Sequence, residues 1–164
     1  MISKTMQDAI NEQINKEFYS SYLYLSMAAF FENKSLTGFG TWLRVQADEE
    51  HVHGMKFYNH LLDRGGQVML KAIAAPPDKW KSELEAFKEV QAHEQAVTAS
   101  INALYELAVK EGDYPAQTLL HWFVDEQVEE EKNAAEIVQK LEMIDARQSG
   151  VLMLDHRLGK RNEQ

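Results

Sequence analysis

The segment QVMLKAIAAPPDKWKS, residues Gln67–Ser82, decides how this chain folds. Pro76 and Pro77 lie inside it, and proline disrupts a helix because it lacks an amide hydrogen and its ring clashes with the preceding turn. The segment is therefore expected to be extended. Its 16 residues can then span about 50 Å, at about 3.3 Å each, which is enough to run the length of a long helix.

Apolar residues recur at helical spacing on both sides of this segment. The pattern predicts four long helices, of about 28–33 residues each, over residues 5–33, 36–63, 83–111 and 115–147, and a short fifth helix over 151–158. Loops of two or three residues join the first helix to the second and the third to the fourth, so each pair is antiparallel. The long segment lets the second and third helices run parallel. The expected fold is an all-α four-helix bundle with one long crossover, in a single domain over residues 1–164.

Several local signals set the predicted helix ends. Thr5 and Asp8 have the spacing of a capping box, and so do Ser82 and Glu85. Glycines are expected to end the second and third helices, and Pro115 suits a first turn. A break between the fourth and fifth helices is expected at Ser149-Gly150.

The composition excludes several classes of protein. In 164 residues, 45% are hydrophobic and 26% charged, which is typical of a globular domain, and no cysteine is present for a disulfide or a thiolate metal site. The 26 acidic residues outnumber the 17 basic ones, so the net charge of −9 disfavours nucleic-acid binding and attracts cations. The sequence shows no apolar secretory signal and no run of about 20 apolar residues, so we expect a cytoplasmic protein without a membrane span.

Each long helix places one glutamate on its apolar face, with apolar residues seven positions before and after it. These glutamates are Glu17, Glu50, Glu94 and Glu130. The first two fall at nearly the same height of the antiparallel pair, whereas the fourth is up to two turns away by the predicted boundaries. A single such glutamate is usually an edge residue whose carboxylate reaches water. Four together in a core are prohibitive unless protons or metal ions compensate them.

Other side chains beside these glutamates favour metal ions. His53 lies three residues after Glu50, and the Glu-x-x-His pair is typical of di-iron carboxylate bundles. Imidazole together with carboxylate suits iron, manganese or zinc. Gln127, three residues before Glu130, and Tyr24, seven after Glu17, are expected beside the site, where Tyr24 could bond a ligand or supply an electron.

A second acidic group is expected to hold a further, weaker cation, although surface carboxylates often gather in this way. It consists of Glu49, Glu126 and Glu129.

Trp122 is expected in the core. The remaining histidines show no paired spacing and are expected to be structural or exposed: His51, His60, His93, His121 and His156.

These elements together resemble bacterial non-haem ferritins over essentially the whole chain. The motifs that carry the resemblance are NEQINKEFYSSYLYLSMA (11–28), WLRVQADEEHVHGMKFY (42–58) and WFVDEQVEEEKNA (122–134). The resemblance implies a ferritin-like bundle that assembles as a hollow shell of 24 subunits around an iron mineral.

The resemblance also assigns roles to the candidate residues. It implies one iron at Glu17, Glu50 and His53, and a second at Glu50, Glu94 and Glu130, with Glu50 bridging. Gln127 matches a glutamine beside the centre and Tyr24 a nearby tyrosine. A third iron site is implied at Glu49, Glu126, Glu129 and Glu130.

The sequence departs from two branches of this family. Bacterioferritins have Glu-x-x-His on two helices and a haem-ligating methionine, where this chain has Gln127-x-x-Glu130 and Val52, so no haem is expected. Vertebrate ferritins carry acidic residues near the start of the fourth helix. This chain has PAQTLLHW (115–122) there, which leaves the route of iron open.

The expected function is iron storage with ferroxidase activity, in which O2 or H2O2 oxidises Fe(II) and ferric oxyhydroxide is deposited inside the shell. Three alternatives remain: a di-iron oxidase or peroxidase without mineral, a small DNA-protecting ferritin relative, and a metal-free interaction module. Ligands within one subunit and the acidic charge argue against the DNA-protecting class.

The C-terminal segment is expected to take part in contacts between subunits. Val151, Leu152, Leu154 and Leu158 are expected to form an uncovered apolar patch that meets symmetry mates at a shell axis. The alternative is an amphipathic tail that folds back on its own subunit.

Overall fold

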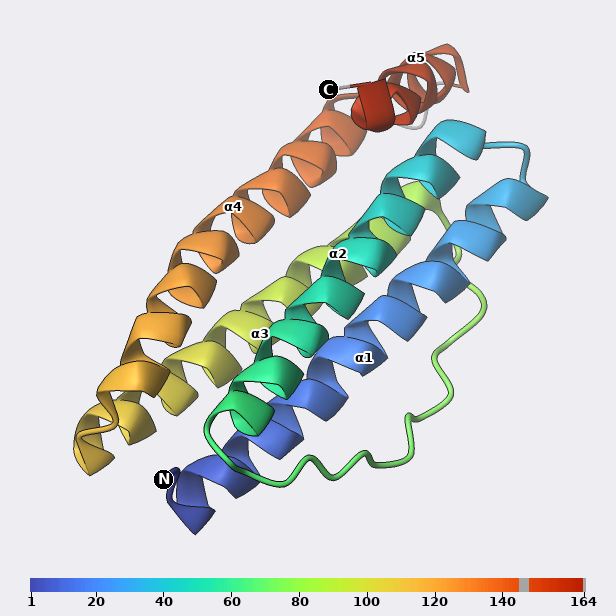
Figure 1. The fold of residues 1–164 in the computed structure, drawn as a ribbon. Coiled ribbons are helices and arrows are strands. Elements are labelled where there is room, and N and C mark those ends of the chain that lie inside the picture. The colour runs from blue at the N-terminus through green and yellow to red at the C-terminus, as the bar shows by residue number, and fades with distance from the viewer. Residues whose placement is uncertain (145–147, 164) are drawn as a thin grey trace.

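The computed structural model describes residues 1–144 and 148–163, and in these ranges the chain is helical with no strand (Figure 1). The helices are α1 (Lys4–Asn33), α2 (Thr37–Asp63), α3 (Glu83–Glu111), α4 (Tyr114–Ile144) and α5 (Gln148–Leu158), followed by the 3-10 helix η1 (Gly159–Glu163). α1 packs against α2 and α3 against α4, which confirms the predicted four-helix bundle.

The crossover between α2 and α3 runs beside α1 for most of its length (Figure 1). Asn11 bonds it at one end, because its amide donates to the carbonyl of Gln67 at 2.9 Å and accepts from the amide of Met69 at 2.7 Å. Ser26, four turns further along α1, donates to the carbonyl of Pro77 at 2.7 Å. The extended segment therefore carries the chain back along the bundle, so that α2 and α3 run parallel.

The helix starts agree with the sequence at α3 and differ at α1. The hydroxyl of Ser82 accepts from the amide of Glu85 at 3.1 Å, as the capping box predicts. The predicted box at Thr5 is wrong, because the cap is Ser3, whose hydroxyl accepts from the amide of Met6. At α4, Asp113 accepts from the amide of Ala116 at 3.0 Å, which leaves Pro115 in the first turn.

The predicted break at Ser149-Gly150 is wrong, since α5 already begins at Gln148. A Cβ atom on Gly150 would lie 2.5 Å from a methyl carbon of Ile144, so this glycine permits close packing inside a helix. The predicted end of the fourth helix at Arg147 lies outside the described residues, which stop at 144 and resume at 148.

α5 docks on the start of α2, at the end of the bundle where α4 finishes (Figure 1). Asp155 accepts from the amide of Phe39 at 2.9 Å, and a Cβ on Gly38 would collide with the carbonyl of Asp155 at 1.7 Å. Leu154 and Leu158 are buried in the subunit's own core. This corrects the expected patch: Leu154, Leu158 and the partly buried Val151 pack on the subunit's own core, while Leu152 stays 53% exposed and its neighbour Met153 76%.

The core consists of two apolar clusters that follow one another along the bundle. In α1 they cover residues 6–14 and 23–31, and in α2 residues 36–47 and 57–61. In α3 and α4 the gap between the clusters falls at residues 91–96 and 124–133. A layer of buried polar side chains fills this gap. Within the described residues, no helix combines the length and the hydropathy that a membrane span requires.

Candidate metal centre

The polar layer contains the four predicted glutamates, one from each long helix. Glu17, Glu50, Glu94 and Glu130 are each between 1% and 4% exposed. Glu130 lies at the same level as the others, between the two apolar clusters, so the height mismatch estimated from the sequence came from boundary error. The bundle therefore gathers four carboxyl groups at its middle.

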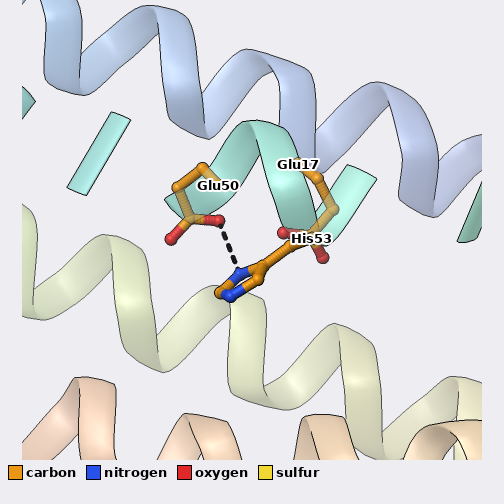
Figure 2. A group of neighbouring side chains, drawn as sticks. All are labelled: Glu17, Glu50 and His53. Atoms are coloured by element: carbon orange, nitrogen blue, oxygen red, sulfur yellow. Dashed lines mark ion pairs between the residues drawn. The ribbon is translucent and has the colours of Figure 1, made fainter. Parts of the chain in front are cut away.

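Glu17, Glu50 and His53 form a group in this layer that could hold a metal ion (Figure 2). One ligand atom from each lies within 4.8 Å of the others, and His53 Nδ1 is 3.3 Å from Glu50 Oε2. Glu17 Oε2 is buried and has no hydrogen-bond partner. A buried oxygen with free lone pairs beside an imidazole nitrogen fits a bound divalent cation.

Glu94 and Glu130 lie near enough to Glu50 for their charges to act on it, and they have polar neighbours of their own. The hydroxyl of Tyr24 donates to Glu94, and Gln127 Nε2 lies 3.3 Å from Glu94 Oε2. Gln46 Nε2 donates to Glu130 Oε2 at 2.6 Å. These donors fix the orientation of each carboxylate.

Burial raises the pKa of all four glutamates. For Glu17, Glu50 and Glu130, the charge of a neighbouring carboxylate raises the pKa further. The charges of Glu94 and Glu130 further raise the pKa of Glu50. For Glu130, burial and the charge of Glu94 bring the pKa to about 7. Among the residues that the structure describes, no lysine or arginine forms an ion pair with any of the four. Only protons or metal ions can therefore neutralise this layer.

Two glutamines in this layer were missed by the sequence reasoning. Gln13 Nε2 donates to Glu17 Oε1 at 2.8 Å, and the hydroxyl of Ser100 donates to Gln13 Oε1 at 2.6 Å. Gln46 plays the equivalent part for Glu130. A signal was available, because Gln13 and Gln46 each lie one turn before a predicted ligand, Glu17 and Glu50.

The second acidic group lies beside the buried layer. His53 Nε2 points toward Glu126 at 3.8 Å from its Oε1, so one imidazole faces both groups. Burial raises the pKa of Glu126, and the charges of Glu129 and Glu49 raise it further. Glu49 forms an ion pair with Arg161 of η1, which nothing in the sequence pattern had indicated.

The other histidines and Trp122 take varied positions. The Nε2 atom of His93 shares a hydrogen bond of 2.7 Å with the hydroxyl of Ser20, and its ring packs edge-on against Tyr24. Burial lowers the pKa of His93 to about 4. Trp122 is 38% exposed and packs edge-on against His53, so its expected core position is wrong. His51 and His156 are exposed, His60 contacts Arg64, and His121 contacts Tyr105.

Comparison with known proteins identifies the family of this chain. The model of the ferritin-like domain matches residues 7–144. A bacterial non-heme ferritin of Bacteroides fragilis is 40% identical over 161 residues, 98% of this chain and 100% of the relative. One of Staphylococcus saprophyticus is 45% identical over 131 residues, 80% of this chain and 78% of the relative. The open pore ferritin of the archaeon Archaeoglobus fulgidus superposes with a TM-score of 0.97 at 46% identity, covering 98% of this chain and 99% of that one. With its crossover bundle and layer of buried carboxylates, the chain belongs to the ferritin family.

Proposed function

We propose that this protein stores iron and oxidises Fe(II) to Fe(III) at a dinuclear centre within each subunit. The observation that carries the proposal is the layer of four carboxyl groups buried between two apolar clusters, with which no lysine or arginine of the described residues forms an ion pair. Burying several such charges is prohibitive unless they are compensated, and whereas protons can neutralise one or two of them, metal ions can compensate all four. Membership of the ferritin family makes iron that cation.

The ligands divide into two sets around Glu50. Glu17, Glu50 and His53 would hold the first iron, because their ligand atoms already lie within 4.8 Å of one another. Glu50, Glu94 and Glu130 would hold the second, with Glu50 shared. Tyr24 and Gln127 orient Glu94 by hydrogen bonds, which makes them positioning groups in this scheme.

Iron is the substrate of this reaction. Each Fe(II) gives up one electron, so two of them reduce O2 to H2O2, or H2O2 to two molecules of water, with uptake of two protons in either case. Carboxylate oxygens stabilise the higher charge of Fe(III) and thereby favour its formation. Hydrolysis of Fe(III) then releases protons and yields ferric oxyhydroxide.

A third iron would bind at Glu49, Glu126 and Glu129, together with Glu130. His53 lies between this group and the dinuclear centre, as its two ring nitrogens show. The third site would thus receive iron that leaves the centre for the mineral.

In this proposal 24 copies of the chain enclose the mineral in the cytoplasm. The subunits hold no haem, since Val52 stands where a haem-ligating methionine would be needed.

Stopped-flow absorbance of apo-protein mixed aerobically with Fe(II) tests the ferroxidase function. We expect a rapid coloured Fe(III) phase that Glu50→Ala abolishes, because the bridging carboxylate serves both metals and His53 alone cannot hold one. An unchanged rate in this variant would refute the site assignment. The fold should survive, because removal of a buried carboxylate removes repulsion in the metal-free state.

Iron retention separates storage from the alternative, a di-iron oxidase or peroxidase without mineral. After many equivalents of Fe(II), a storage protein elutes from a sizing column with its iron, whereas an oxidase leaves the ferric product outside.

The triple variant Glu49→Ala, Glu126→Ala and Glu129→Ala should keep the first two-iron oxidation and change the later iron-to-oxygen ratio. Loss of the first phase would place these residues in the primary centre.

A further inference from the structure

The C-terminal helix η1 brings Arg161 onto the acidic side of the metal centre. Its guanidinium pairs with Glu49 at 2.5 Å and donates to Gln46 Oε1 at 2.8 Å. The guanidinium carbon also lies 4.6 Å from the centre of the Trp42 ring. Three side chains of α2, spaced by three and four residues along one face, thus meet a single arginine.

Gln46 connects this arginine to the dinuclear centre. Its side-chain oxygen accepts from Arg161, and this fixes its amide nitrogen toward Glu130, to which it donates at 2.6 Å. Gln46 is fully buried, so the amide has no water to turn toward. Arg161 therefore touches one proposed ligand of the third iron directly and a second one through a single glutamine.

We propose that Arg161 is a built-in competitor of metal ions at the third site, which holds Glu49 and orients Glu130 until a metal displaces it. This inference rests on the proposed third iron site. A divalent ion at Glu49 and Glu130 would lie within a few ångströms of the guanidinium, and the two positive charges repel. The carboxylate of Glu49 also loses lone pairs to the bond from the guanidinium.

The position of Arg161 suits such an exchange. α5 is anchored by Leu154, Leu158 and Asp155, whereas Arg161 follows it in the short helix η1 and keeps its guanidinium partly exposed. A partly exposed ion pair contributes only modest free energy, so an arriving divalent metal ion can replace it. The consequence is a weak third site, from which iron passes on instead of accumulating.

Anaerobic calorimetric titration of the assembled apo-protein with Zn²⁺, a redox-inert probe, tests this competition. We expect two tight equivalents and a weaker third in the wild type. Arg161→Gln should tighten the third equivalent about fivefold, as loss of one partly exposed charge pair implies. Any change in the first two equivalents should be toward weaker binding, because Gln46 loses the partner that holds it toward Glu130. Arg161→Lys restores the competing charge, so it should return the third affinity toward the wild-type value.

Arg157→Gln is the matched control. This arginine lies one turn earlier, on α5, and lines the same surface hollow as Arg161 and Glu49. Its loss changes the net charge equally, so a specific effect of Arg161 requires that Arg157→Gln leave the third affinity unchanged. Equal tightening in both variants would show a general charge effect and overturn the proposal.

Tryptophan emission gives a second readout that does not depend on iron oxidation. Displacement of the guanidinium from the Trp42 ring should change the emission as the third Zn²⁺ binds. The change should be absent from Arg161→Gln and from Trp42→Phe, whereas Trp122, beside His53, reports the earlier equivalents in all variants.

The outcomes distinguish this inference from the function on which it rests. A third equivalent that the triple glutamate variant loses, but that Arg161→Gln leaves at wild-type affinity, would overturn the competitor role and keep the third site. A wild type that binds only two Zn²⁺ would overturn the third site and the competitor role together. A wild type without the two tight equivalents would refute the dinuclear centre itself.

Discussion

Glu130 shows how strongly a single residue of the polar layer opposes folding in the absence of metal. Its pKa is raised to about 7, chiefly by burial, from an ordinary value of 4.5. Because the pKa is higher in the folded state than in the unfolded state, the contribution of Glu130 to the stability of the folded protein is greatest below about pH 4.5, where Glu130 is protonated in both states. That contribution is lost as the pH rises through about 7. The loss is about 3 kcal/mol at most, since one pKa unit corresponds to about 1.4 kcal/mol.

The unfolding free energy of the metal-free protein is therefore expected to fall between pH 5 and pH 8. Glu17, Glu50 and Glu94 act in the same direction, because burial raises their pKa as well. Glu130→Gln should reduce the fall by up to about 3 kcal/mol. Urea unfolding at a series of pH values, with chelator and at constant protein concentration, measures it. A parallel decline in the variant would show that Glu130 is ionised at no cost.

Gln13 offers a test of positioning around the proposed first metal. It links Glu17 to the hydroxyl of Ser100, so Gln13→Leu leaves Glu17 free to turn. Loss of such an outer hydrogen bond weakens metal affinity about 10- to 100-fold, and Ser100→Ala should have a smaller effect in the same direction. Anaerobic Zn²⁺ titration measures both. Lys16→Met, at the exposed end of this chain of hydrogen bonds, is the control and should change affinity least.

The candidate site shows what sequence can predict at the level of residues. Seven-residue spacing was enough to select the four glutamates, because a residue two turns from apolar neighbours shares their face. Arg161 could not be found in this way, since its contact with Gln46 joins positions 115 residues apart. Such contacts depend on where α5 docks, which no local pattern specifies.

At the scale of elements, the crossover and the four long helices follow from Pro76-Pro77, short loops and apolar periodicity. The start of α5 was misplaced because Gly150 was interpreted as a helix breaker, whereas it removes a clash with Ile144. A glycine that ends a helix and one that permits packing look alike in sequence. The structure separates them: Gly112 has a left-handed backbone with φ of 65°, and Gly150 lies inside a helix.

Gly38 tests how firmly α5 is docked. A Cβ there would overlap the carbonyl of Asp155, so Gly38→Ala must push α5 away from α2. The expected loss of stability is about 1–3 kcal/mol, as for an overpacked site. Limited proteolysis should cut the C-terminal segment faster in this variant. Thr37→Ala, at the exposed neighbouring position, is the matched control, and equal protection in both variants would contradict the docking.

At the scale of the whole molecule, the single subunit leaves apolar side chains uncovered. Several lie over α1 and the crossover, where a shallow pocket is lined by Tyr22, Leu25 and Ile73. Leu152 and Met153 remain exposed on α5. Contiguous patches of this kind mark interfaces, and a second copy of the same chain can cover them in a closed symmetric assembly.

Sedimentation tests this assembly, which storage requires because a mineral needs an enclosed space. Twenty-four copies of 18.9 kDa give a particle of about 450 kDa. The double variant Leu25→Glu and Ile73→Glu places charges on the exposed apolar surface over α1 and the crossover. It should release single subunits, because unpaired charges buried in an interface are costly. Leu152→Glu with Met153→Glu alters only the end of the bundle and should yield incomplete assemblies. A wild-type protein that remains monomeric at micromolar concentration in neutral buffer would contradict the shell, and the storage role would fail with it even if oxidation at the dinuclear centre were intact.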